Sequence, residues 1–130
     1  MKLTEENYVE LAEEAIKKLI GKQDRYGHSI EPVTTSKIRN LLAMTADIYN
    51  EVINSQNELL PTEVIGRIKY LKIRFVYESG REPKVKNLVE TANILGYLDE
   101  IGNSRSQYIL FSRYMEALVA YRKYYCEKDE

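Results

Sequence analysis

Apolar residues recur every three or four positions along almost the whole chain, which is the spacing of amphipathic α-helices. Runs that alternate apolar and polar residues, as half-buried strands do, are nearly absent. The prolines and most glycines fall between the periodic stretches. The spacing predicts five helices, over residues 4–20, from a cap at 34–36 to a turn at 54–60, from 61 or 62 to 80, 83–101 and 104–125. We therefore expect an all-α fold, a single-domain bundle of about five amphipathic helices over residues 1–130.

Two segments lack the helical spacing. Residues 21–34 form the longest non-periodic stretch, which predicts an exposed and mobile loop. The last four residues, 127–130, predict a frayed tail. Inside the fourth predicted helix, Gly96 is a weak point because glycine has a low helix propensity.

The spacing also indicates which face of each helix is buried. In the third predicted helix the apolar residues fall in a narrow sector, which must face the core: Val64, Ile68, Leu71 and Phe75. In the fifth, the predicted inner side is Leu110, Tyr114, Ala117, Leu118, Tyr121 and Tyr125. The tyrosines at its end, Tyr121, Tyr124 and Tyr125, either close the core or form a patch for self-association, and the sequence leaves both open.

The composition is that of an ordinary soluble domain, with 44% hydrophobic and 30% charged residues in 130. The single cysteine, Cys126, has no partner for an internal disulfide, which fits a reducing cytoplasm. No apolar run approaches the roughly 20 residues that span a bilayer. The acidic N-terminus lacks the apolar core of a signal peptide. We therefore expect a cytoplasmic protein with no membrane partner.

Residues that carry out catalysis are scarce. The one histidine, His28, lies in the predicted loop, where a general base would be poorly held. Cys126 has no histidine near it in sequence, and the acid pair Asp47 and Glu51 is typical of a solvated helix face. No spacing resembles a metal site or a phosphate-binding glycine loop. The sequence predicts no catalytic residue, no metal and no cofactor, so we expect that the protein is not an enzyme.

The charge is unevenly distributed. The chain has a formal net charge of −1, yet residues 67–86 hold seven basic and two acidic side chains, a local charge of +5, so the remainder sums to −6. Within the third predicted helix, arginines and tyrosines alternate along one stripe: Arg67, Tyr70, Arg74 and Tyr77. Lys69 and Lys72 lie on the opposite flank of the apolar sector. Such clustering favours an anionic partner over a purely solvated surface.

Two helix starts extend this basic character. Lys84 and Lys86 follow Arg81 at the start of the fourth predicted helix, and Lys37 and Arg39 lie at the start of the second. Helix N-termini attract phosphate through free backbone N–H groups and the helix dipole. In a small bundle two such starts can meet at one end. Because no base-reading motif is present, we expect recognition of nucleic-acid shape or backbone.

Several stretches resemble the small subunit of the type III-A (Csm) CRISPR effector complex. They are TTSKIRNLL, YLKIRFVYESGRE with VKNL behind it, and RYMEALVAYRKYY, and the similarity runs in order from about residue 6 to residue 125. The family's length and all-helical character agree with the pattern described above.

The resemblance implies a non-catalytic helical bundle that stacks in several copies inside a ribonucleoprotein. Its expected partners are the guide RNA and target RNA, other copies of itself, and the backbone and large subunits. Cleavage of target RNA would belong to the backbone subunit, and cleavage of DNA and synthesis of cyclic oligoadenylate to the large subunit. The residues expected to bind the RNA backbone are Lys37, Arg39, Lys69, Lys72, Arg74, Arg81, Lys84, Lys86 and Arg113.

Two other interpretations compete with this one. A helical DNA-binding regulator needs a recognition helix with short polar residues, and the third predicted helix is too apolar for that. An RNA-free helical adaptor would use the basic segment to bind an acidic protein partner. Arg113 is the least constrained of the expected contacts, because it can also pair with Glu116 in its own helix.

Overall fold

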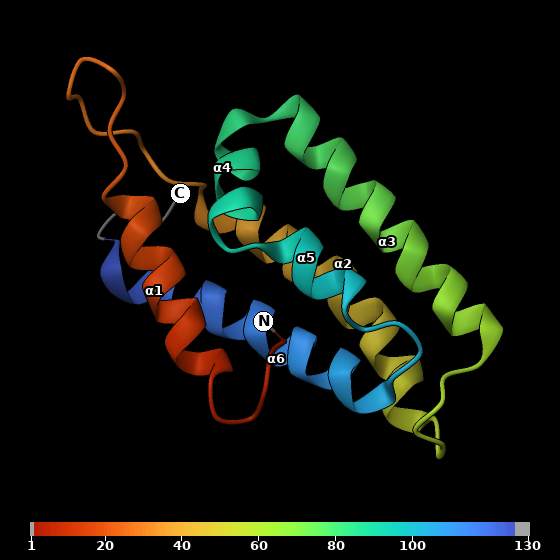
Figure 1. Cartoon of the computed structure of the whole chain (residues 1–130). Helices are drawn as coiled ribbons and strands as arrows, with labels where there is room; N and C mark the ends of the chain where they lie inside the picture. Colours follow the sequence, from red (N-terminus) through yellow and green to blue (C-terminus); the bar gives the residue numbers. More distant parts are fainter. Residues whose placement is uncertain (1, 127–130) are drawn as a thin grey trace.

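The computed structural model describes residues 2–126, and in this range the chain forms six α-helices (Figure 1). They are α1 (Tyr8–Ile20), α2 (Thr35–Asn54), α3 (Thr62–Arg81), α4 (Pro83–Thr91), α5 (Ile94–Asp99) and α6 (Arg105–Tyr125). The only extended pairings among these residues are two isolated bridges, so the predicted all-α class is confirmed. None of the helices in the described range combines the length and apolar character needed to cross a bilayer. The tail predicted at 127–130 lies outside the described residues.

The bundle is built around α6, which packs against α1 and α2. On the other side, α3 lies against α2, α4 and α5. Figure 1 shows α1 and α3 on opposite sides of the molecule. The core of α3 is the predicted one, with Val64, Ile68, Leu71 and Phe75 all buried. One full side of α3 therefore remains turned away from the bundle.

The first helix begins later than the spacing predicted. Thr4 and Asn7 bond to each other in both directions, with Thr4 N–H donating to Asn7 Oδ1 at 2.7 Å and Asn7 N–H donating to Thr4 Oγ1 at 3.1 Å. These bonds hold a turn before the helix, which starts at Tyr8. The other predicted bounds agree within a few residues, except in the fourth helix.

The prediction of one helix over residues 83–101 is wrong. The chain breaks between α4 and α5 at Asn93, whose φ of 51° and ψ of 41° place it in the left-handed region. Asparagine tolerates this conformation better than most residues. The break does not occur at Gly96, yet Gly96 gives the Asn93 side chain room, because a Cβ on it would lie 2.4 Å from Asn93 Oδ1 and that side chain would have to move. The freed carbonyl of Ala92 accepts a hydrogen bond from the Tyr114 hydroxyl at 2.8 Å.

The predicted inner face of the last helix is only partly right. Tyr114 and Leu118 are buried as expected, but the other four predicted positions, Leu110, Ala117, Tyr121 and Tyr125, are half-buried at its edges. The centre of the face also contains Tyr108, Phe111, Met115 and Arg122. Because α6 packs against two helices, it buries a wider sector than a single stripe. The buried sector of α6 also contains two polar groups, and both are hydrogen-bonded. The Tyr108 hydroxyl donates to Thr45 O at 2.7 Å, and Arg122 Nε donates to Val33 O at 2.8 Å.

The segment between α1 and α2 is exposed from residue 21 to residue 29, as predicted. A bridge joins Gln23 to Ser29, and Asp24 Oδ1 accepts hydrogen bonds from the backbone N–H groups of Tyr26 and His28 at 2.8 and 3.0 Å. Its last part differs from the prediction, because Val33 is fully buried. Mobility of this loop stays a prediction.

Candidate nucleic-acid interface

Four of the predicted RNA-binding side chains line one hollow on the surface. Lys37 and Arg39 come from α2, and Arg74 and Arg81 come from α3, around a volume of about 620 Å³. Glu78 is the one carboxylate in the lining. The sequence-distant basic groups at the start of α2 and the end of α3 thus face the same space. We call this surface the basic hollow.

The start of α4 closes the basic hollow beside the start of α2. Lys37 Nζ lies 3.6 Å from Glu82 Oε2, which confirms that these two helix starts meet. Both starts are capped by the chain itself. Thr34 Oγ1 accepts from the Lys37 N–H at 3.3 Å, and Glu82 Oε1 accepts from the Lys84 N–H at 3.3 Å. An anion in the hollow would therefore bind the cationic side chains more than free backbone N–H groups.

Glu78 holds the two arginines of α3 close together. Its carboxylate oxygens lie 3.8 Å from Arg74 Nη2 and 3.7 Å from Arg81 Nη1. Arg81 also lies over the Tyr77 ring, 5.8 Å from its centroid. The arginine side chains are 45% and 56% exposed, and ion pairs at such exposure contribute little to stability. A phosphate can therefore compete for both guanidinium groups at small cost to the fold.

Lys84 and Lys86 flank this surface without lining it. Lys84 Nζ pairs with Glu31 Oε2 at 3.4 Å, which ties α4 to the segment before α2. Lys86 is exposed on α4. Both lie next to Val85, which does line the basic hollow. The caps explain why lysines are tolerated here, since the Glu82 carboxylate offsets their charge at the positive end of the α4 dipole.

The remaining predicted contacts lie elsewhere. Lys69 and Lys72 line a separate small hollow on the other flank of α3, where Lys72 Nζ pairs with Asp99 Oδ1 at 2.8 Å. Arg113 is exposed on α6 and pairs with Glu5 at 3.1 Å, so the alternative pairing with Glu116 is wrong. The structure thus divides the nine predicted residues among three surfaces.

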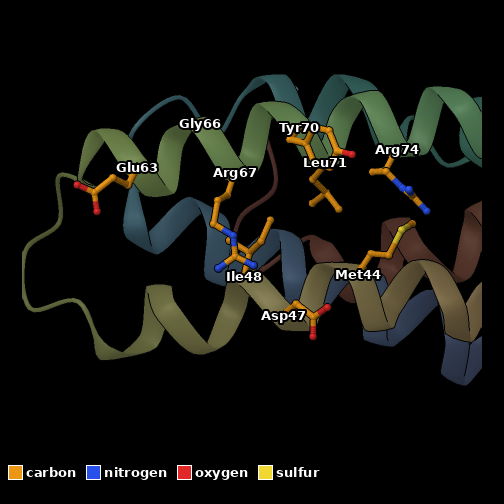
Figure 2. Close-up of a pocket in the computed structure, with 9 residues that line it drawn as sticks. All are labelled: Met44, Asp47, Ile48, Glu63, Gly66, Arg67, Tyr70, Leu71 and Arg74. Carbon is orange, nitrogen blue, oxygen red and sulfur yellow. The ribbon is translucent and has the colours of Figure 1, made fainter.

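A second groove adjoins the basic hollow and was not predicted. It runs between α2 and α3 with a volume of about 450 Å³ (Figure 2). We call it the α2–α3 groove, and it is lined by Met44, Asp47, Ile48, Glu63, Gly66, Arg67, Tyr70, Leu71 and Arg74. Arg74 lines both surfaces. The contributions of Met44 and Asp47 have no signal in the sequence, because they depend on how α2 and α3 pair.

The two side chains considered for catalysis come from different segments of the chain. His28 is exposed in the loop, with Nδ1 3.6 Å from Asp24 Oδ2. Cys126 is a half-buried thiol directly after α6. Over residues 2–126, no three His, Cys, Asp or Glu side chains gather where they could hold a metal ion.

Comparison with known proteins supports one family. The family model described as Csm2 Type III-A matches residues 13–128. A Mycobacterium tuberculosis protein named CRISPR system Cms protein Csm2 is 41% identical over 130 residues, which cover all of both chains. Proteins of the same name from Streptococcus thermophilus and Enterococcus italicus are 45% identical over 127 residues (98% of each chain) and 40% identical over 95 residues (72% of this chain, 68% of the relative). The resemblance seen in the sequence is thereby confirmed, and the chain belongs to the Csm2 type III-A family.

Proposed function

We propose that this protein is the non-catalytic small subunit of a type III-A CRISPR effector complex and contacts the guide RNA–target RNA duplex through the basic hollow. Several copies would stack beside the backbone and large subunits. The observation that carries the proposal is the convergence of four cationic side chains from α2 and α3 on one surface of an otherwise acidic chain. Family membership supports it independently.

The chemistry of the basic hollow suits a phosphate backbone. Arginine and lysine side chains neutralise phosphates without reading bases, which is what a guide of variable sequence requires. The lining has four cations and one carboxylate, and that carboxylate is shared between two arginines. Lys37 is also paired with Glu82 beside the hollow, so two carboxylates face four cations, and the surface keeps a positive charge with these ion pairs formed. Repetition of the subunit along the RNA would let weak individual sites act together.

The remaining predicted contacts stay predictions. Lys84 and Lys86 extend the same edge of the molecule. Lys69, Lys72 and Arg113 face other directions and would meet different RNA segments or neighbouring subunits. A stack in which each subunit has two different neighbours exposes several distinct surfaces, so dispersed cations are compatible with it.

The test is a double neutralisation of the basic hollow in the reconstituted effector complex. Arg39→Gln with Arg81→Gln removes two cations and leaves the Lys37–Glu82 pair and Arg74 in place. The matched control, Lys18→Gln with Arg25→Gln, makes the same charge change at exposed positions on α1 and the loop. RNA affinity measured against salt concentration should lose about 0.7–0.9 from its logarithmic slope for each phosphate contact removed.

An unchanged salt slope in the hollow variant, with the complex fully assembled, would contradict RNA contact at this surface. Loss of one protein neighbour without any change in RNA affinity would instead support the RNA-free adaptor. The non-catalytic assignment is tested separately by incubating the purified chain with RNA and divalent metals. Cleavage that survives repurification and disappears with a point mutation in this chain would contradict it.

A further inference from the structure

We infer that the α2–α3 groove holds one unstacked base of the bound RNA, with the adjoining phosphate on Arg74. This inference rests on the proposed function and adds a base-binding site to the phosphate contacts. The starting observation is that Arg74 lines both the groove and the basic hollow. A nucleotide whose phosphate reaches Arg74 therefore has the groove within reach of its base.

The groove has an apolar floor. Met44 and Ile48 rise from α2, and Leu71 descends from α3 between them (Figure 2). Ile48 and Leu71 are buried, so they also fix the distance between the two helices. The volume of about 450 Å³ falls in the range of sites that take small planar ligands. Gly66 also lines the groove, and the space beside it is open, since a Cβ added there would meet no atom within 4 Å.

The rim carries what an RNA base requires. Tyr70 lines the groove and remains 59% exposed, so its ring is accessible to a ligand. Bases stack on such rings whatever their identity. Arg67 extends from α3 toward α2 and supplies donors, while the carboxylates of Asp47 and Glu63 lie at the edges of the groove (Figure 2). Arg67 pairs with Glu51 across an exposed contact, which is weak enough to be exchanged.

The mixture of positive and negative side chains around the groove favours a base over an acidic protein segment as its occupant. A groove for acidic side chains would have cations alone around its floor, whereas this one has two arginines and two carboxylates. A base offers both donors and acceptors at its edge and an apolar face to the floor. Continuity with the basic hollow then supplies the phosphate site that a nucleotide needs and that a peptide does not.

The chain contains a matched pair of tyrosines for the test. Tyr70 and Tyr77 lie seven residues apart on the same side of α3, and are 59% and 58% exposed. Only Tyr70 lines the groove. Tyr70→Ala therefore removes the stacking surface. Tyr77→Ala removes an equally exposed ring that contacts Arg81 of the basic hollow and does not line the groove, so it is the control for the groove crosslink and not for the salt slope. Neither ring is part of the core, so both variants should assemble normally.

The experiment uses the reconstituted complex with target RNA that contains 4-thiouridine, irradiated and mapped by mass spectrometry of the crosslinked peptides. Wild type and Tyr77→Ala should crosslink to peptides of α2 and α3 that line the groove. Tyr70→Ala should lose this crosslink and bind RNA about tenfold more weakly, within the range for losing one stacked base. Its salt slope should be unchanged, because no phosphate contact is removed.

A groove crosslink that persists in Tyr70→Ala would overturn the inference. The inference would also be overturned if bound RNA crosslinked to no residue of α2 or α3. If the Arg39 and Arg81 variant still lowered the salt slope in that case, the proposed function would stand without the base site. Loss of a protein neighbour in Tyr70→Ala with RNA affinity unchanged would show that the groove docks protein. A salt slope that is unchanged in the Arg39 and Arg81 variant, together with no RNA crosslink to α2 or α3, would remove the proposed function and the base site together.

Discussion

Replacing Tyr114 by phenylalanine tests how the break between α4 and α5 is stabilised. The Tyr114 hydroxyl donates to Ala92 O at 2.8 Å, and both residues are buried. Ala92 ends α4, so its carbonyl lacks the helical N–H partner that residues farther inside a helix have. Burial raises the pKa of Tyr114, which keeps its hydroxyl protonated and available as a donor. Tyr114→Phe leaves this carbonyl buried without a donor.

The expected cost follows from comparison with a second buried tyrosine. Leaving a buried acceptor unpaired lowers the free energy of unfolding by about 1–3 kcal/mol, so we expect a loss of about 2 kcal/mol for Tyr114→Phe. Tyr108 donates to Thr45 O at 2.7 Å, but that carbonyl lies inside α2 and accepts from its own helix as well. Tyr108→Phe therefore loses only the net contribution of one hydrogen bond, about 1 kcal/mol.

Thermal and urea unfolding measure both changes. For a chain of this length 1 kcal/mol corresponds to about 3–5 °C, so Tm should fall by about 6–10 °C in Tyr114→Phe and by about half as much in Tyr108→Phe. The urea m value should stay constant. Tyr124→Phe on the same helix is the control, because Tyr124 is 78% exposed. The edge contact of Tyr97 with ring 114, at 5.1 Å between centroids, survives in phenylalanine. A loss in Tyr108→Phe equal to or larger than that in Tyr114→Phe would refute the reasoning.

Three further changes test other local features by the same unfolding measurements. Gly96→Ala should lower the free energy of unfolding of the wild type by about 1 kcal/mol, because the added Cβ clashes with the Asn93 side chain. In an Asn93→Gly background the same change should be neutral or stabilising, since glycine removes the clashing side chain and accepts the positive φ. Equal effects in both backgrounds would contradict the clash. Arg122→Met should lower the free energy of unfolding by about 1–3 kcal/mol, because it leaves the carbonyl of buried Val33 without the Nε donor. An unchanged Tm would show that this bond contributes nothing. Hydrogen bonds from Ser104 and Ser106 hold the pKa of Glu58 below its ordinary 4.5, so its stabilising contribution is present above that pH and lost as pH falls through the folded-state value. The Tm difference between wild type and Glu58→Gln should accordingly shrink on acidification, and a difference that grows would reverse the sign of the argument.

The parts of the fold that follow from local spacing were predictable. The buried sector of α3 needed only the helical period, since all four of its predicted core residues are buried. The inner face of α6 was harder, because the period does not reveal that two helices would cover it. Arg122 looks like a surface residue in sequence, and its burial depends on a carbonyl of the distant residue Val33.

The break at Asn93 had no clear local signal. Apolar residues continue through α4 and α5 at helical spacing, and the glycine that attracted notice, Gly96, lies inside α5. The left-handed turn is stabilised from outside, by the Tyr114 hydroxyl on α6. Long-range hydrogen bonds of this kind cannot be read from a window of one helix.

In the candidate site too, local helix geometry was predictable and the pairing of distant residues was not. Helical geometry already separated the stripe containing Arg74 from the flank containing Lys69 and Lys72, and the structure keeps them apart on two surfaces. That Lys37 would approach Glu82, and that Met44 would face Leu71, depended on tertiary pairing. The sequence therefore identified the charges, and the packing of α2 on α3 determines which of them act together.

The loop between α1 and α2 has a consequence for engineering. Its two ends are fixed independently of its tip, by the Gln23–Ser29 bridge and by Val33, which is buried and bonded to Arg122. Doubling the length of a closed loop costs only about 0.6 kcal/mol in chain entropy. The tip at Tyr26 and Gly27 is exposed and contributes nothing to the basic hollow or the α2–α3 groove. A short epitope or a fluorophore-binding tag inserted there would report on this protein while leaving both surfaces as they are.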